Sequence, residues 1–455
     1  MIRQLVIAAL VGVALSAPSN KIDQSLAKTL SSKGSANVVI VFKQDTSDLI
    51  KAINSGRFAS RGQKITTLKA GLEQLASTSQ KNTVSFLQSK DAKFNAFWIT
   101  NQIFVKDASA ELVQAIAAFS EVVEIRQEQI LYIDEPIPAS NQINAEWGIE
   151  KIEAEAAWSL PGGNNGQGVV VATIDTGVRG THESLSNNFR ASKGWLDPYT
   201  NTASPTDGNG HGTHTMGTIV GSGGIGVAPG AQWISCRGCG AISCTEAALI
   251  ACGQFTLCPT DADGSNADCA QAPNLVSNSW GGGQGNTFYD QVIDLWRQAD
   301  IIPIFANGNA GPGCGSANSP GDSPKVIGVG ATTADDGIAS FSSLGPSVGG
   351  IIKPELSAPG QNVRSAWSTG DAAYNTISGT SMATPHVAGA AALILSANPG
   401  LGYDQVKDLL QNNADRDLQR ASDCDGVPSD TFPNNVYGYG RINARKALAA
   451  AISGI

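Results

Sequence analysis

The sequence predicts an α/β fold in which helices cover both faces of a parallel sheet, preceded by a small α+β domain. Short apolar runs such as Val169–Ile174 and Ile301–Ala306 have the length and composition of strands buried on both faces. The alanine-rich run Met382–Ala397 is long enough for a buried helix. The region before about residue 140 contains few glycines and more lysine and glutamine than the rest, which indicates a separate domain.

The N-terminus has the pattern of a secretory signal peptide. An apolar core over Leu5–Leu15 follows Arg3 and precedes the small residues around Ser16 and Ala17. This core is too short to span a bilayer, and no later stretch is long and apolar enough to do so. We therefore expect residues 1–17 to be removed and the protein to be secreted and extracellular.

Residues 18–140 are expected to form the small domain. The predicted elements follow the order β-α-β-β-α-β, which is that of a ferredoxin-like unit. They are strand Asn37–Phe42, a helix over about Gln63–Ser89, a hairpin over Ala96–Val105, helix Ala108–Phe119 and strand Val122–Arg126. An unrelated adaptor domain is the alternative. The proline-containing stretch Asp134–Asn144 is expected to be an exposed linker. Residues 141–455 would then form the larger α/β domain.

Three polar residues in the larger domain lie at the ends of predicted elements. Asp175 follows the strand Val169–Ile174, at the edge where open α/β sheets build their sites. His211 opens a small-residue segment that we interpret as a helix over about Thr213–Val220. Ser381 directly precedes the helix Met382–Ala397, and Pro385 is expected in its first turn, where a missing N–H costs little.

A carboxylate, an imidazole and a hydroxyl in this order fit nucleophilic catalysis. A serine hydroxyl is a poor nucleophile at neutral pH and needs an adjacent base to take its proton. Histidine suits that role, and a buried carboxylate fixes its tautomer and stabilises the imidazolium. The other histidines, His182, His214 and His386, are expected to be packed and structural. A zinc site on His211 and His214 would lack a third ligand, so metal catalysis is a weak alternative.

Three long motifs carry these residues. They are Val170-Val-Ala-Thr-Ile-Asp-Thr-Gly, Gly210-His-Gly-Thr-His and Gly379-Thr-Ser-Met-Ala-Thr-Pro-His. In this order they resemble the subtilase family of serine endopeptidases. Asn278-Ser-Trp-Gly-Gly and Tyr437-Gly-Tyr-Gly-Arg-Ile-Asn are similar in style to the bacillopeptidase F branch of that family. The resemblance implies a subtilisin-like fold and a secreted, self-processing zymogen that cleaves peptide bonds through an acyl-enzyme.

The resemblance also assigns further site residues. Asn309 would donate its amide to the oxyanion, a role that needs a preorganised donor. The edge Ser279-Trp280-Gly281 would pair with an extended peptide. The first pocket would be walled by this edge and by Ala306–Asn309, Gly308 included, with Asn318 near its floor. Because these walls are uncharged, we expect cleavage after apolar or aromatic residues. Trp280 would add apolar area to a neighbouring subsite, or alternatively pack against the cysteine-rich insertion.

The remaining composition favours an extracellular protein without a cofactor. All eight cysteines lie after residue 235, and a signal peptide favours disulfides over zinc or redox motifs, although their pairing stays open. The segment Val220–Pro229 is short and lacks carboxylates, so the family's high-affinity calcium site is expected to be absent, and no metal or cofactor is expected. The acidic residues Asp261, Asp263 and Asp268 are interpreted as a solvated loop.

The expected partners follow from the same reasoning. The formal net charge of −9 argues against nucleic acid, and no membrane partner is expected. The expected partners are polypeptide substrates and the protein's own pro-domain, which would act as an intramolecular inhibitor of a monomer. A catalytically inactive subtilase-like binding protein is the alternative. An esterase is disfavoured because Gly-Thr-Ser-Met-Ala replaces the Gly-x-Ser-x-Gly nucleophile elbow.

Overall fold

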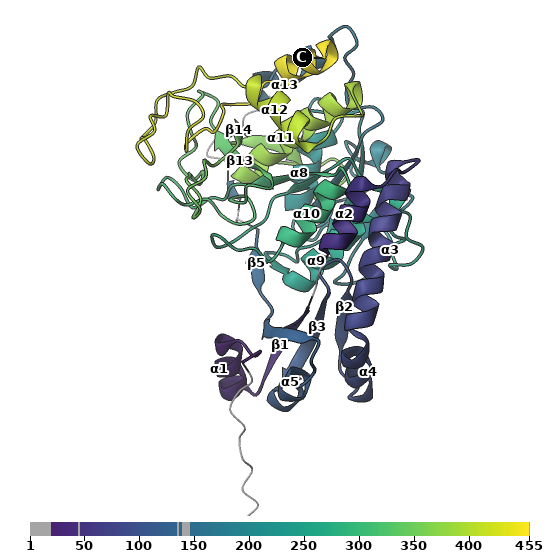
Figure 1. Cartoon of the computed structure of the whole chain (residues 1–455). Coiled ribbons are helices and arrows are strands. Elements are labelled where there is room, and N and C mark those ends of the chain that lie inside the picture. The colour runs from purple at the N-terminus through teal and green to yellow at the C-terminus, as the bar shows by residue number, and fades with distance from the viewer. Residues whose placement is uncertain (1–19, 44–45, 134–135, 139–145, 455) are drawn as a thin grey trace, which may run out of the picture. The chain divides into compact units, whose positions relative to one another are not determined.

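A computed structural model describes residues 20–43, 46–133, 136–138 and 146–454, which fall into two compact units (Figure 1). The first unit comprises residues 1–44, 76–96 and 101–128, and the second comprises residues 45–75, 97–100 and 129–455. The predicted signal peptide and the predicted boundary at residue 140 lie outside the described residues. Residues 45–75, which we assigned to the small domain, belong to the second unit.

The first unit is built on a four-stranded sheet in the order β2-β3-β1-β4. Its central strand β1 pairs antiparallel with both β3 and β4. The strands are β1 (Ser35–Phe42), β2 (Phe94–Phe97), β3 (Gln102–Ser109) and β4 (Val122–Gln127), and the helices are α1 (Gln24–Lys33), α4 (Lys81–Ser89) and α5 (Ala110–Ala117). The ferredoxin-like assignment of this unit stays a prediction.

The long helix predicted over residues 63–89 is two helices. α3 (Arg61–Ser79) ends before Gln80, and α4 begins after it. The Gln80 side chain is buried and donates a hydrogen bond to Asn101 Oδ1 at 3.0 Å. Helices α1 and α2 (Ser47–Ser55) were not predicted.

The second unit is built on a seven-stranded sheet in the order β14-β13-β12-β11-β7-β9-β8. Each pairing of neighbouring strands is parallel, so the predicted α/β class is confirmed. The strands are β7 (Val170–Asp175), β8 (Trp195–Leu196), β9 (Gln232–Arg237), β11 (Leu275–Asn278), β12 (Ile302–Ala306), β13 (Ile327–Thr332) and β14 (Leu356–Pro359).

Helices flank this sheet. α8 and α11 pack against each other and against the sheet, and α9 and α10 do the same. These four helices are α8 (His211–Val220), α9 (Glu246–Leu257), α10 (Asp290–Gln298) and α11 (Thr380–Ala397). The second unit also contains α6 (Trp147–Lys151), α7 (Ala154–Trp158), α12 (Tyr403–Asn412) and α13 (Ala444–Ser453). The strands of the second unit that lie outside this sheet are β5 (Ile130–Tyr132), β6 (Ile137–Pro138), β10 (Ser243–Thr245), β15 (Val363–Ala366) and β16 (Tyr374–Ser378).

Helix α11 begins two residues earlier than predicted, at Thr380, which corrects the expected place of Pro385. The proline lies in the second turn, where its N–H would have bonded to the carbonyl of Ser381. That carbonyl instead accepts a hydrogen bond from Ser279 Oγ at 3.2 Å. Because Pro385 has no N–H, the carbonyl of Ser381 is available to Ser279. This hydrogen bond connects the segment after β11 to the start of α11.

All eight cysteines are paired. The disulfides are Cys236–Cys252, Cys239–Cys244, Cys258–Cys269 and Cys314–Cys424. The first two join β9 to α9 and close the loop that leads into β10. The prediction of disulfides is confirmed, and the pairing that the sequence left open is now assigned.

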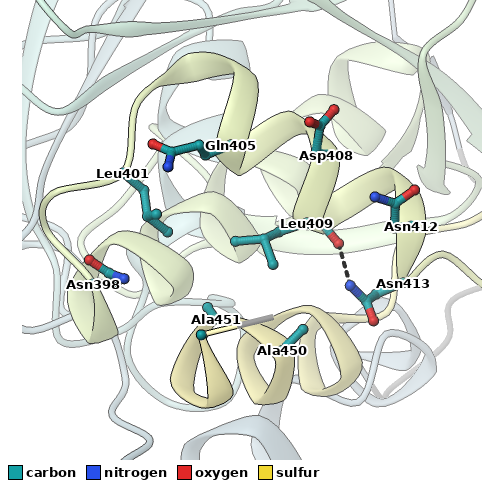
Figure 2. A pocket seen from close by; sticks show the side chains of 10 residues that line it. Asn398, Leu401, Gln405, Asp408, Leu409, Asn412, Asn413, Ala450 and Ala451 are labelled. Carbon is teal, nitrogen blue, oxygen red and sulfur yellow. Dashed lines mark hydrogen bonds between the residues drawn. The ribbon is translucent and has the colours of Figure 1, made fainter.

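A cavity of about 540 Å³ is lined by residues such as Leu401, Leu409 and Ala450. Figure 2 shows these side chains at α12 and α13. None of the predicted site residues lines this cavity. Within the described residues, no helix has the length and apolarity needed to cross a membrane.

Candidate active site

The structure brings two of the three predicted catalytic residues into direct contact. Asp175 ends β7, and His211 is the first residue of α8. His211 Nδ1 lies 2.7 Å from Asp175 Oδ1, and both side chains are buried. The carboxylate also accepts hydrogen bonds from Thr176 N at 2.7 Å and from Thr215 Oγ1 at 3.3 Å. A carboxylate held in this way selects the tautomer with the proton on Nδ1, so that Nε2 is the basic nitrogen.

Ser381 is the second residue of α11, the helix that packs against α8. Its Oγ lies 3.4 Å from the carbonyl oxygen of Ser279, and its own carbonyl accepts the Ser279 hydroxyl. The side chain therefore lies at the N-terminal end of a long helix, where the helix dipole favours a developing negative charge. Ser279 belongs to the edge that the resemblance assigns to substrate binding.

Asn309 lies beside the same helix end. Its Oδ1 accepts hydrogen bonds from the backbone N–H and the hydroxyl of Thr380, both at 2.9 Å. Since the carbonyl oxygen of the amide is held by Thr380, the Nδ2 group is the donor that the side chain presents. A Cβ built on Gly379 would lie 3.2 Å from this Nδ2, which places the amide at the turn before Ser381.

The residues assigned to the first pocket also lie together. Asn318 N donates to the carbonyl of Asn307 at 2.9 Å. Gly308 has φ +102°, and a Cβ there would lie 2.6 Å from Asn318 Nδ2, so only glycine allows this approach. A Cβ on Gly281 would lie 2.6 Å from the carbonyl oxygen of Ser319. Ala306 ends β12 beside Asn307 and is 7% exposed.

Trp280 lies beneath this edge. Its ring packs edge-on against Tyr289 and Phe305, with centroids 5.1 and 5.4 Å away, and its exposed fraction is 2%. These ring partners lie outside the cysteine-rich segment, which disfavours the packing alternative considered from the sequence. A contribution of Trp280 to a subsite stays a prediction.

An extended segment of the chain itself occupies the edge at Gly281. Tyr132 exchanges two backbone hydrogen bonds with Gly281, at 3.3 and 3.1 Å. On its other side, β5 pairs antiparallel with β10, and Ile133 N donates to the carbonyl of Ile242 at 3.2 Å. Leu131 and Ile133 are buried, whereas Tyr132 is 54% exposed. The segment therefore binds as an added strand between two edges, with alternate side chains directed into the protein.

The remaining histidines have structural surroundings, as predicted. His182 Nε2 lies 2.8 Å from the carbonyl of Ala373, and His214 Nε2 lies 3.0 Å from that of Val363. Burial lowers the pKa of His214 to about 3 and that of His386 to about 4. Both rings are therefore neutral at neutral pH.

One residue near the contact between Asp175 and His211 was not identified from the sequence. Asp207 lies four residues before His211. Its carboxylate accepts hydrogen bonds from the hydroxyl of Thr176, which follows Asp175, and from the hydroxyl of Thr213 in the first turn of α8. The spacing of Asp207-Gly-Asn-Gly-His211 offers a signal, because Asp and Asn before a helix are capping residues. Within the described residues, no group of three or more His, Cys, Asp or Glu side chains could hold a metal ion.

Comparisons with known proteins identify the family of the chain. Residues 166–440 match the model of the subtilase family. The chain is 35% identical to bacillopeptidase F of Bacillus subtilis (strain 168), over 96% of this chain and 33% of that protein. It is 35% identical to alkaline serine exoprotease A of Vibrio alginolyticus, over 68% of this chain and 55% of that protein. It is 32% identical to subtilisin Savinase of Lederbergia lenta, over 66% of this chain and 97% of that protein. The chain thus spans one third to just over half of the first two relatives.

Proposed function

The chain belongs to the subtilase family, and we propose that it is a secreted serine endopeptidase with Asp175, His211 and Ser381 as its catalytic triad. The observation that carries the proposal is the 2.7 Å contact of His211 Nδ1 with a buried carboxylate, beside the helix that begins at Thr380. Covalent labelling of Ser381 by a fluorophosphonate, which reacts with activated serines, is the direct test.

Each triad residue has one role in the proposed reaction. Ser381 Oγ attacks the carbonyl carbon of the peptide bond while His211 Nε2 takes the hydroxyl proton. The imidazolium then gives this proton to the leaving amine, and an acyl-enzyme remains. Water attacks the ester in the second half of the reaction, with His211 again as the base. Asp175 stabilises the imidazolium in both halves and stays ionised.

The oxyanion of each tetrahedral intermediate needs preorganised donors. Asn309 Nδ2 is suited to this role because Thr380 holds the other end of its amide. The backbone N–H of Ser381, in the first turn of α11, is the second donor. Neither donor has to reorganise when the negative charge develops, so the stabilisation is available at the transition state.

The residues before the peptidase are proposed to act as an intramolecular inhibitor. β5 lies along the substrate edge in the manner of a bound peptide, and cleavage within residues 134–144 by Ser381 of the same molecule would follow. Arg61 supplies a second attachment inside the second unit, because its guanidinium donates to the carbonyls of Ala272, Pro273 and Ala299. Burial of this guanidinium lowers the pKa of Arg61 to about 10, so it is charged at neutral pH.

The activity should fall on the acidic side of neutral pH. Protonated His211 cannot accept the serine proton, so kcat/KM decreases as the imidazole becomes charged. His214 and His386 do not contribute to this change, because their pKa values of about 3 and 4 keep them neutral there. Initial rates between pH 4 and 9 measure the effect, and a kcat/KM that is flat down to pH 4 would exclude a histidine base.

Stability should also decrease as the pH falls below about 6.5. In the unfolded chain, His214 and His386 bind protons near their ordinary pKa of 6.5, whereas in the fold they do so only near 3 and 4. Below pH 6.5 the unfolded chain therefore binds more protons than the folded protein. The free energy of unfolding is highest above pH 6.5 and decreases progressively toward pH 4. Short assays after a pH jump separate this loss from the protonation of His211.

The first pocket should prefer apolar or aromatic residues. Its walls, Ser279–Gly281 and Ala306–Asn309, carry no charge, and Asn318 is neutral. The nearby carboxylate of Asp322 is held by Gly285 N and by Ser319 Oγ, so it braces the loop. Peptide substrates that differ only at the residue before the cleaved bond should show kcat/KM for Phe and Leu at least about 10-fold above that for Lys and Arg.

A variant with a negative charge at the pocket floor tests whether the absence of charge causes this preference. Asn318→Asp should raise kcat/KM for Lys and Arg substrates relative to Phe, because a buried carboxylate would pair with the cation. A wild-type profile dominated by Lys or Arg would refute the uncharged pocket. An unchanged profile in the variant would show that Asn318 does not face the substrate.

A further inference from the structure

We propose that Asp207 is a positioning residue that sets the distance between the catalytic Asp175 and His211. The inference rests on the proposed peptidase function and deepens it. Asp207 reaches the two sides of the pair through backbone and hydroxyl groups. Its effect on catalysis would therefore act through the geometry of the pair.

The first turn of α8 is held from outside the helix. Its N-cap is Gly210, which has no side chain to bind the free N–H groups of that turn. Three side chains do so instead, and their hydrogen bonds are His211 N to Asn209 Oδ1 at 3.0 Å, Gly212 N to Thr176 Oγ1 at 2.9 Å, and Thr213 N to Asp207 Oδ2 at 2.9 Å. The residue that carries the imidazole is therefore placed by partners that precede the helix.

Asp207 joins this helix end to the turn that follows Asp175. Its Oδ1 accepts from Asn209 N, Gly210 N and Thr176 Oγ1, each at 2.9 Å. Its Oδ2 accepts from Thr213 N at 2.9 Å and from Thr213 Oγ1 at 2.6 Å. Thr176 is the neighbour of Asp175 in the chain, and its hydroxyl also receives Gly212 N. One carboxylate thus binds both the strand end that carries the catalytic carboxylate and the helix end that carries the imidazole.

The space between these two elements leaves little room for adjustment. A Cβ on Gly212 would lie 2.1 Å from the carbonyl oxygen of Gly177 and 3.1 Å from the Cβ of Asp175. Gly177 and Asp207 also form an isolated β-bridge. Loss of the carboxylate would release the helix end from the turn, and a shift of the imidazole by about 1 Å is enough to cost about 100-fold in rate.

A carboxylate is needed because all of its partners are donors or hydroxyls. An ionised carboxylate only accepts hydrogen bonds, whereas an amide presents two N–H groups on one side. In Asp207→Asn, that NH₂ group would face either Asn209 N and Gly210 N or Thr213 N, which are donors themselves. The isosteric amide is therefore a specific test of the carboxylate.

The test uses the full-length protein and its mature form, with Asp207→Asn, Thr176→Val and Thr176→Ser. We expect Asp207→Asn to lower kcat and the rate constant of Ser381 labelling by about 10- to 100-fold, with KM changed less than about twofold. Thr176→Val should show a smaller fall of the same kind, and Thr176→Ser, which keeps the hydroxyl, should restore the wild-type rates. In the combined Asp207→Asn and Thr176→Val variant the losses should not multiply, because both changes break one connection.

Asn443→Ala is the stability control. Asn443 caps α13 by accepting from Lys446 N at 3.0 Å, so its removal also loosens a helix start, in a helix other than α8 and α11. It should lower Tm without lowering kcat per labelled site. Wild-type rates in Asp207→Asn would overturn the inference. If Asp207→Asn does not fold, the threonine variants decide instead, and equal rates in Thr176→Val and Thr176→Ser would overturn it. If the wild-type protein itself fails to label at Ser381, the proposed function falls instead.

Discussion

Ser381→Ala should remove the peptidase activity almost completely. Without the hydroxyl no acyl-enzyme can form, and loss of a triad nucleophile lowers kcat by about 10⁶-fold. Labelling by a fluorophosphonate should vanish, while thermal unfolding should change little because the hydrogen bond of the hydroxyl to Ser279 O is long, at 3.4 Å. Ser396→Ala, at the other end of the same helix, is the matched control and should keep wild-type activity. Full labelling of the Ser381→Ala protein would refute the assignment.

The same variant tests self-processing. If Ser381 cleaves its own linker, Ser381→Ala should remain a precursor of residues 18–455 after signal removal, when purified away from other proteases. The wild-type protein should process at a rate that does not depend on its concentration, because the linker sets the effective concentration. Processing of the variant at the wild-type bond would show that another protease does the maturation, without affecting the assignment of Ser381 as the nucleophile.

The parts of the fold that were predicted are those specified by local sequence. The strand that ends at Asp175 is a short apolar run and the helix that contains Ser381 is a long one, so length and composition identify both. The start of α11 was predicted two residues late, since the sequence does not show that Ser279 supplies the partner for the Ser381 carbonyl. That partner is 102 residues away in the chain.

The features that were not predicted depend on contacts between distant segments. Arg61 binds carbonyls more than 200 residues away, so local sequence does not show that α2 and the start of α3 group with the second unit. The disulfide pairing depends on which loops meet in space, which the number and spacing of cysteines do not determine. Asp207 was missed because the sequence reveals only the contact of a capping residue with the helix that follows it. The hydrogen bond of Asp207 with Thr176, which lies after β7, depends on the fold.

Asp175 and Asp197 are buried carboxylates at the carboxyl ends of two strands of the same sheet. Comparing their variants separates the effect of the Asp175 charge on catalysis from its effect on stability. Asp175 accepts from His211, Thr176 and Thr215. Asp197, at the end of β8, has no exposed surface and accepts from the hydroxyls of Thr200 and Thr202 and from Tyr199 N. Burial alone would raise the pKa of Asp197, but these hydrogen bonds hold it below its ordinary value. Asp197 is therefore an ionised anchor at neutral pH.

Asp175→Asn should lower kcat by about 10⁴-fold, because the neutral amide neither stabilises the imidazolium nor enforces the tautomer with the proton on Nδ1. Asp197→Asn removes a buried charge of the same kind and should reduce stability, yet kcat per labelled site should stay within about twofold of the wild type, since its partners do not include His211. Single-turnover rates normalised by fluorophosphonate titration separate the two effects. KM should change little in either variant, because neither carboxylate contacts the substrate edge. Equal losses of kcat in both variants would mean that Asp175 acts only as a structural anchor, and the 2.7 Å contact with His211 would then have no catalytic meaning.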